Sequence, residues 1–571
     1  MPPFFCSPVE LPGFHRRSNS VELRETSHNT AISTRKYQDD INMSVDRIRA
    51  IDKIEKLPPP VDDDEDKHEL GVSLQPYTSS QHGPRNQDRR GSTLLGDVIV
   101  EIDPVVEKRV RRKFDKTLVV LVFLAYMLAF LDRSNIGNAQ NAGMGNDLGF
   151  DDEHYQWLLT IFYIPYILFE GFALMWKIMP PHIWATITVA TWGLASTLQS
   201  AAPNWQSLMV CRWFLAMAEA GFAPGVPYLL SFFYRRRELG LRCGIFLSAA
   251  PLATTFAGAL AYAITSTPSP PLPPWRLLFL IEGLPTLILA IILYFHLPSS
   301  PTTAPVLTPT ELSVAKARLS LHTPQQGQTP TGWRSISPRE ILSTFESLQT
   351  LLPSLMYFSL NVSFSSLPVF LPSILSSMSL SPNTSTAQGL TAPPYFLSFL
   401  ICILSTYLAD KTQQRGLTII CLSLVGGAGY VLLATLPEHL VSVRYFSVFL
   451  AAGGVFPSIA NVLPWTLNNQ GSDTKRGVGI AVLNMVGQCG PLLGTRLFPE
   501  RDRPGYTKGM VVCAMFMFVN AGLAAGLRWH FARKNKRLEE RERAQVVLRV
   551  GDGGRRENGE REGMVGFRYV L

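Results

Sequence analysis

Long apolar runs constrain the fold of this chain more than any other feature. From about residue 114 onward, runs of about 20 mostly apolar residues alternate with short polar loops, and each run is long enough to cross a bilayer as a helix. Only 17% of the 571 residues are charged, below the roughly 25% that is usual in soluble domains. The pattern predicts an all-α membrane protein whose main partner is the lipid bilayer.

The loop charges predict the topology. A basic cluster from Lys108 to Lys116 directly precedes the first apolar run, and basic residues favour the cytoplasmic side. The first outer loop carries Asp147, Asp151, Asp152 and Glu153 and no basic residue. We expect twelve spans, which place both termini in the cytoplasm. They begin near Thr117, Tyr155, Ile183, Ser207, Leu241, Arg276, Ser347, Leu390, Leu417, Val443, Gly477 and Lys508.

Composition shifts along the chain predict its domain organisation. The first 113 residues are polar, and a loop rich in Pro, Ser and Thr divides the spans six and six. Asn383-Thr384-Ser385 is a glycosylation sequon in an expected outer loop, although its closeness to the membrane leaves an unmodified Asn383 as the alternative. The expected parts are a disordered cytoplasmic tail (1–113), an N-terminal six-helix bundle (114–297), a cytoplasmic linker (298–340), a C-terminal six-helix bundle (341–531) and a cytoplasmic tail (532–571).

Several function classes are disfavoured by composition and motifs. The net charge of +8 could suggest nucleic acid, but the basic residues cluster at helix ends and in the tails, as topology alone would require. The seven cysteines form no CxxC pair, so we expect neither a disulfide framework nor a metal site. The chain has no HExxH, GxSxG or P-loop motif. We therefore expect no enzyme activity, no cofactor other than a coupling proton, and no P-loop ATP-driven pump.

The two halves of the chain resemble each other weakly and in register. The string CRWF at Cys211 matches VRYF at Val443, Pro165-Tyr166 matches Pro394-Tyr395, and Gly244-Ile245 matches Gly479-Ile480. Each pair lies six spans apart, with a nearly constant offset of about 230 residues. Parallel six-helix repeats are typical of the major facilitator fold, in which the substrate binds between the halves near the midplane. We therefore predict twelve transmembrane helices in two six-helix halves.

Four charged residues lie inside expected spans of the first half. Asp132 and Arg133 follow about 15 apolar residues, and Arg212 and Glu219 are two helical turns apart on one face of the fourth span. Unpaired, the four would cost on the order of 10 kcal/mol to insert. One interpretation is two ion pairs that lock the fold or form a gate. The other is proton-coupled anion transport, in which Arg133 holds a substrate carboxylate and Asp132 and Glu219 exchange protons.

Further polar residues within the spans are candidates for the substrate site. Asn361, Asn461 and Gln488 could donate hydrogen bonds from the second half, while Tyr126 and Arg212 could line the cavity from the first. Interhelical hydrogen bonding is the alternative for the amides, and aromatic packing is the alternative for Tyr126. Glu219 has no acidic counterpart in the aligned second half, where Ala451 stands, which favours a functional role for this carboxylate.

Several motifs resemble the anion:cation symporter family of the major facilitator superfamily. They include FLDRSNIGNA, RWFLAMAEAGFAPGVPYLLSFFY and WRLLFLIEGLPT in the first half, and SLNVSFSSLPVFLPSIL, ANVLPWTLNNQGSDTKRG and GQCGPLLGTRLF in the second. The likeness is greatest to fungal permeases of the allantoate, pantothenate and nicotinate type, and above all to high-affinity nicotinic acid transporters. The resemblance implies proton symport of a small organic anion across the plasma membrane, with proton and substrate handled at Asp132, Arg133 and Glu219.

The chain also departs from the superfamily pattern. The loop between the second and third spans, LMWKIMPPHIW, has one basic residue and no acid, whereas YLADKTQQRG after the eighth span keeps Asp410, Lys411 and Arg415 as candidate gating residues. The fifth span lacks the Gly-Pro pair of many drug antiporters, which favours uptake. We expect a monomeric importer of a nicotinate-like monocarboxylate. The alternatives are an exporter of a secondary metabolite and a transporter-like nutrient receptor.

Overall fold

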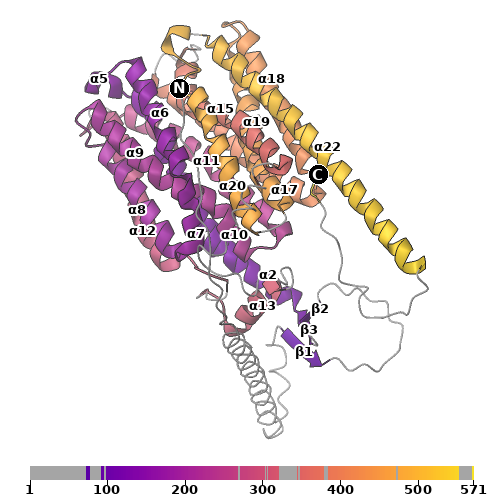
Figure 1. The fold of residues 1–571 in the computed structure, drawn as a ribbon. Coiled ribbons are helices and arrows are strands. Elements are labelled where there is room, and N and C mark those ends of the chain that lie inside the picture. The colour runs from indigo at the N-terminus through magenta and orange to yellow at the C-terminus, as the bar shows by residue number, and fades with distance from the viewer. Residues whose placement is uncertain are drawn as a thin grey trace, which may run out of the picture. The chain divides into compact units, whose positions relative to one another are not determined.

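The spans follow the chain in two halves, which a computed structural model describes in atomic detail (Figure 1). The described residues are 72–76, 92–95, 98–267, 270–301, 304, 306–320, 344, 347–377, 384–470, 473–503, 505–551 and 569–571. Asn383, the expected glycosylation site, lies outside them.

The N-terminal half contains six membrane-crossing segments, several of them built from more than one helical piece. They are η2–α3–α4 (Asp115–Val119, Val120–Ser134, Ile136–Asn141), α6–η3–α7 (Asp152–Leu168, Glu170–Leu174, Met175–Ile178), α8 (Pro181–Gln199), α9–η4–α10 (Trp205–Phe222, Ala223–Gly225, Val226–Phe233), α11 (Arg236–Thr265) and α12 (Pro274–His296). The short helix α5 (Met144–Leu148) lies between the first two segments.

The C-terminal half repeats this arrangement. Its segments are α15 (Leu348–Ser377), α16–α17 (Thr384–Gly389, Ala392–Thr412), α18 (Arg415–Thr435), α19 (Val441–Asn469), α20–α21 (Asp473–Gly487, Cys489–Gly494) and α22 (Thr507–Gly551). The 3-10 turn η7 (Glu500–Asp502) precedes α22. Three short strands, β1 (Val72–Pro76), β2 (Ser92–Leu95) and β3 (Val98–Ile102), form an antiparallel sheet of order β1-β3-β2 before the first span.

The predicted twelve-helix fold is confirmed. Among the described residues, nine helices are long and apolar enough to cross a membrane. The segments containing α6, α8 and α9 supply the other three: the break at η3 limits α6 to 17 residues, and polar side chains lower the mean hydropathy of α8 and α9. Every expected span start lies within two residues of a helix.

Local sequence signals explain where the segments around the site begin and break. Asn204 caps α9 through a reciprocal pair of contacts with Ser207, and Asp151 caps α6 by accepting from the His154 N–H at 2.9 Å. Pro165 lies inside α6, which gives way to the 3-10 turn η3. Near the point where α9 gives way to η4, the Gly221 carbonyl accepts hydrogen bonds from the indole N–H groups of Trp176 and Trp184, each 2.9 Å long.

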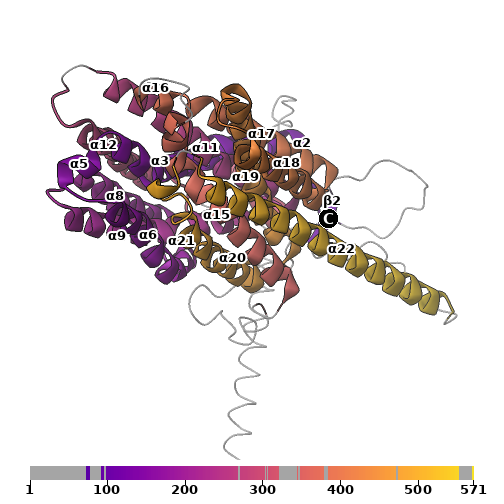
Figure 2. The same cartoon turned by 90° about the horizontal axis from the view of Figure 1, so that it is seen from above.

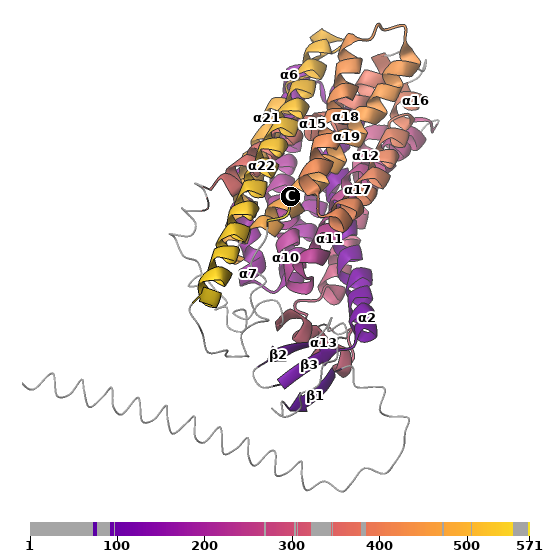
Figure 3. The same ribbon diagram turned by 90° about the vertical axis from the view of Figure 1, so that its right-hand side faces the viewer.

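The two halves contact each other mainly through α11, which packs along α17 and α19, while α15 meets α4 and α21 meets α6 (Figures 2 and 3). Small residues permit the closest approaches. A Cβ on Gly244 would lie 2.5 Å from Thr406 side-chain atoms, and one on Gly137 would lie 2.5 Å from the Val369 carbonyl oxygen. Both helix pairs therefore depend on glycine for their separation.

An ion-pair cluster ties two short helices to the N-terminal half. Helix α13 (Pro309–Ser320), from the region between the halves, packs on α2 (Pro104–Phe114). Lys113 Nζ lies 2.6 Å from Glu311, and buried Arg318 pairs with Glu107 at 3.0 Å and with Glu238. We call this end of the bundle, which also carries Arg242 and Arg415, the basic end.

These helices differ from the expected organisation. The segment 1–113 was expected to be disordered, and the strands β1–β3 and the helix α2 lie within or at the end of it. For the linker 298–340 and the tail 532–571 only a cytoplasmic location was expected; the first contains α13, and α22 continues past residue 531 to Gly551. The charged side chains of α2 and α13 form ion pairs with each other, although the partners are about 200 residues apart in the sequence. Composition alone does not predict such pairs.

Arg318→Ala is expected to loosen α13. Removing one partner of a buried pair costs about 3–5 kcal/mol, because the remaining carboxylates lose their counter-charge. Hydrogen–deuterium exchange of residues 309–320 should therefore rise by at least about tenfold. The matched control is Lys508→Ala, which removes an exposed pair with Asp502 and should leave exchange unchanged. Unaltered exchange in Arg318→Ala would show that packing alone holds α13.

Candidate functional site

Arg133 lies where the first span is interrupted. Helix α3 ends at Ser134, Asn135 follows, and α4 starts at Ile136. The side chain is 10% exposed, and its guanidinium lies among residues of the N-terminal half. The rings of Phe162 and Tyr166 on α6 lie 4.7 and 5.0 Å from its guanidinium carbon. Aromatic faces stabilise a cation that has little access to water.

Glu219 on α9 is the ionic partner of Arg133. Its Oε2 accepts from Arg133 Nη2 at 2.6 Å and from Nε at 3.2 Å. Glu219 is 1% exposed, and its second oxygen, Oε1, is buried and has no hydrogen-bond partner among the described residues. One oxygen thus takes donors from both Nε and Nη2, the edge of the guanidinium that could otherwise fork onto another carboxylate.

Asp132 points away from this pair. Ser196 of α8 donates to its Oδ1 at 2.6 Å, and Thr286 of α12 donates to its Oδ2 at 3.2 Å. Asp132 is fully buried between three helices of the N-terminal half, and among the described residues no arginine pairs with it. One interpretation of the sequence expected two ion pairs among these four charged residues. The structure forms one of them, Arg133–Glu219.

Arg212 also differs from its expected role. It donates to the backbone carbonyl of Arg133 at 3.4 and 3.5 Å and lies over Phe162 at 5.1 Å. It does not line the pocket described below. Because α3 is interrupted directly after this carbonyl, Arg212 helps to hold the break that positions Arg133.

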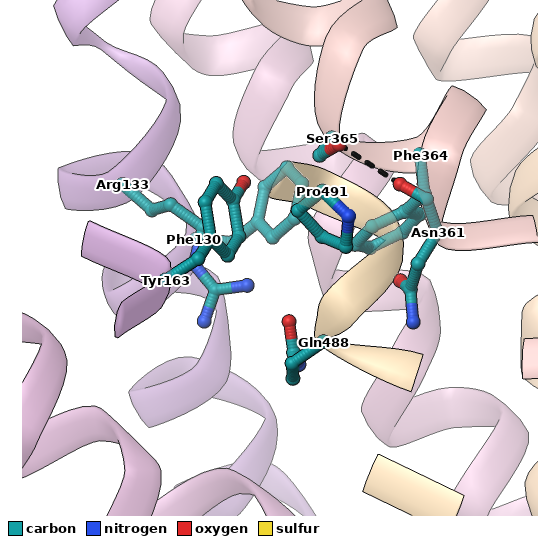
Figure 4. Close-up of a pocket in the computed structure, with 8 residues that line it drawn as sticks. All are labelled: Phe130, Arg133, Tyr163, Asn361, Phe364, Ser365, Gln488 and Pro491. Atoms are coloured by element: carbon teal, nitrogen blue, oxygen red, sulfur yellow. Dashed lines mark hydrogen bonds between the residues drawn. The ribbon is translucent and has the colours of Figure 1, made fainter. Parts of the chain in front are cut away.

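A small cavity adjoins the Arg133 side chain (Figure 4). Both halves of the molecule supply its wall, and the second half contributes an amide from each of two helices, α15 and the start of α21. The lining residues are Phe130, Arg133 and Tyr163 from the first half and Asn361, Phe364, Ser365, Gln488 and Pro491 from the second. Asn361 Nδ2 is buried without a hydrogen-bond partner in the described structure.

The sequence-predicted residues are thus only partly brought together. Arg133, Asn361 and Gln488, three of the predicted substrate-binding residues, line the cavity. Asn461 does not: its Nδ2 donates to Ser405 at 3.1 Å and to the Pro457 carbonyl at 2.9 Å, so it joins α19 to α17. Tyr126 is also absent from the lining, and its ring packs on Phe246 of α11 at 4.5 Å. These contacts favour the alternative interpretation of each residue, which is interhelical hydrogen bonding for Asn461 and aromatic packing for Tyr126.

The candidate gating residues lie at the basic end. Arg415 is buried and pairs with Asp410, and this pair packs against Gly240 of α11, where any side chain would collide with it. A pair from the second half thus contacts the first half at a point where the halves must separate if this end opens. Lys411 is exposed, and no ion pair to it is seen in the described part of the chain.

Five residues that line the cavity were not predicted from the sequence, and three of them are aromatic. Phe130 precedes Arg133 by three residues, Phe364 and Ser365 follow Asn361 by three and four, and Pro491 follows Gln488 by three. Helical neighbours at these spacings share a face. The same periodicity applied around each predicted polar residue would have found these four, whereas Tyr163 lies on a helix with no predicted site residue.

Comparisons with known proteins agree with this architecture. Residues 122–495 match the Major Facilitator Superfamily. The MFS transporter prlL of Fungal sp. (strain NRRL 50135) is 33% identical over 74% of this chain and 86% of its own length. The high-affinity nicotinic acid transporter of Saccharomyces cerevisiae is 26% identical over 85% of this chain and 89% of its own.

A solved structure shares the fold. The proton:xylose symporter XylE, bound to 6-bromo-6-deoxy-D-glucose, superimposes with a TM-score of 0.56 at 15% identity, covering 72% of this chain and 95% of that one. The chain therefore belongs to the Major Facilitator Superfamily and is a multi-span membrane transporter.

Proposed function

We propose that this chain is a proton-coupled symporter of a small aromatic monocarboxylate of the nicotinate type, within the anion:cation symporter family. The observation that carries the proposal is the Arg133–Glu219 pair beside a cavity walled by aromatic rings and amides. The nicotinic acid transporter among the relatives supports the choice of probe. We further propose a monomer in the plasma membrane with both ends cytoplasmic, as the basic loop residues favour.

Coupling of proton and substrate would follow from competition between Glu219 and the substrate carboxylate for the Arg133 guanidinium. While Glu219 is ionised, it occupies the donors of Arg133 that a substrate carboxylate would need. A proton on Glu219 weakens this pair and releases the guanidinium, which can then bind the substrate in a bidentate manner. Proton and anion would thus bind together, and their charges would cancel at a buried site where an unpaired charge is costly.

The remaining wall is largely aromatic, which suits a substrate with a planar ring. Phe130 and Phe364 lie 5.1 Å apart in an edge-on arrangement, and Phe456 lies behind both. In the conformation seen the cavity has a volume of about 10 Å³, roughly the space of one water molecule, so a substrate ring would enter as the two halves move apart. The unpaired Asn361 Nδ2 offers a donor to a second polar atom of the substrate, such as a ring nitrogen.

Phe364→Ala is expected to weaken nicotinate binding by about tenfold, because an aromatic contact and its buried area together contribute about 1–2 kcal/mol. Inhibition of labelled nicotinate uptake by benzoate should weaken similarly, while inhibition by lactate should change little.

The matched control for this experiment is Phe358→Ala. Phe358 is on the same helix, but it packs on Phe516 of α22 and does not line the cavity. An equal loss of benzoate and lactate inhibition in Phe364→Ala would contradict the aromatic substrate class.

A further inference from the structure

Glu170 is a second buried carboxyl that the Arg133–Glu219 exchange does not use. It opens the 3-10 turn η3, which breaks the second span after α6. Its side chain is fully buried, and both carboxyl oxygens lack a hydrogen-bond partner among the described residues. An ionised carboxylate in such surroundings would lack both water and a hydrogen-bonded counter-charge, which favours the neutral acid in the conformation seen.

Glu170 lies next to the site and not in a remote part of the core. Arg133, Tyr166 and Tyr357 are close enough to interact with it electrostatically. Helix α6 passes the guanidinium at Phe162 and Tyr166 and reaches Glu170 one turn later, on the way to the basic end. Glu170 is therefore displaced from Arg133 towards the basic end.

The turn η3 is also in contact with the other half of the molecule. It packs on α9, η4, α7 and α6 of its own half and on α20 of the second half. When the halves separate at the basic end, the contact between η3 and α20 is among those that must break, and water would reach a carboxyl that is now sealed. The titratable residues on these elements are Asp152, Glu153, His154, Tyr155, Tyr163 and Tyr166 (α6), Lys177 (α7), Cys211, Arg212 and Glu219 (α9), and Asp473, Lys475 and Arg476 (α20), while η4 has none.

We propose that Glu170 is a second proton-carrying side chain of the transport cycle, on the route from the Arg133–Glu219 pair to the basic end. The inference rests on the proposed proton coupling. In the closed state Glu170 carries a proton; opening of the basic end hydrates the carboxyl, which releases that proton to water and becomes an anion that can attract Arg133. Arg133 then has two alternative carboxylate partners, Glu219 and Glu170, and the proton distribution between them selects one.

The first test needs no substrate. Infrared difference spectra of the reconstituted protein between about pH 5 and about pH 7.5 report loss of the carboxylic-acid carbonyl band. We expect Glu170→Gln to reduce this loss and Glu170→Asp to retain it. The matched control is Glu282→Gln, because Glu282 is equally buried and its oxygens are equally unpartnered, but it lies on α12, which packs mainly on helices of the first half. A Glu170→Gln spectrum identical to that of the unmodified protein would overturn the proposal.

The second test uses labelled nicotinate. Glu170→Gln should slow net proton-driven uptake by about tenfold or more while sparing exchange of internal for external nicotinate, because exchange requires no proton release. Net uptake with unaltered rate and pH dependence would overturn the role of Glu170. Absence of nicotinate transport by the unmodified protein would instead count against the proposed substrate, and the infrared result would still decide whether Glu170 releases a proton.

Discussion

Glu219→Gln is expected to abolish accumulation of nicotinate against its gradient while leaving counterflow exchange largely intact. Glutamine keeps the shape of the side chain but carries no titratable proton, and it pairs with Arg133 far more weakly than a carboxylate does. Arg133 would then be permanently available to substrate. Accumulation should fall to the level set by equilibration, and the pH dependence of uptake should flatten.

The measurement is uptake into cells or proteoliposomes with an imposed proton gradient, alongside exchange in the same preparation. Exchange is the internal control, because it reports that the variant is folded and binds substrate. Normal gradient-driven accumulation by Glu219→Gln would contradict the assignment of Glu219 as the coupling carboxylate.

Replacement of Arg133 should have an equally large effect on a different quantity. Arg133→Ala removes the carboxylate anchor and leaves Glu219 buried without its counter-charge, a change that costs about 3–5 kcal/mol. Nicotinate affinity should fall by at least about 100-fold. Arg133→Lys retains the charge but not the forked donor geometry, and it should lie between Ala and the unmodified protein.

The double variant Arg133→Ala with Glu219→Gln separates binding from stability. It removes both charges and should recover thermal stability in detergent relative to Arg133→Ala, while nicotinate binding stays lost. Equilibrium binding of labelled nicotinate to the purified protein provides the readout. Affinity within about threefold of the unmodified protein in either variant would show that the anion binds elsewhere.

The fold could be predicted from the sequence because crossing a bilayer requires long apolar segments, which are easily seen in the sequence. Twelve apolar runs, the alternation of loop charge and the repeated Pro165-Tyr166 and Pro394-Tyr395 pairs all follow from helix length and internal repetition. The helices α2 and α13 have no such apolar segments. The folding of these two helices depends on ion pairs such as Lys113–Glu311. From sequence alone, each charged side chain is expected to face water, because its partner lies far away in the chain.

For the site, the sequence could predict which residue types lie at mid-depth in the membrane, but not which of them contact one another. Arg133 and Glu219 were both candidates, and they form one pair. The spacing of Arg212 and Glu219 puts both on one face of α9, but only the structure shows that the first meets the Arg133 carbonyl and the second its guanidinium. Likewise, a buried amide such as Asn461 is equally suited to a substrate and to Ser405, and helix packing decides between them.

Proton symport of nicotinate can be measured as uptake of the labelled acid by cells that lack their own carrier, at about pH 5 and about pH 7.5, with and without a protonophore. Proton symport predicts uptake that is faster at the acidic pH, where Glu219 is more readily protonated, and that the protonophore suppresses. Benzoate should compete more strongly than lactate. A correctly localised protein that takes up none of these acids, or does so with no response to pH or protonophore, would contradict the account and direct attention to export of a cellular product.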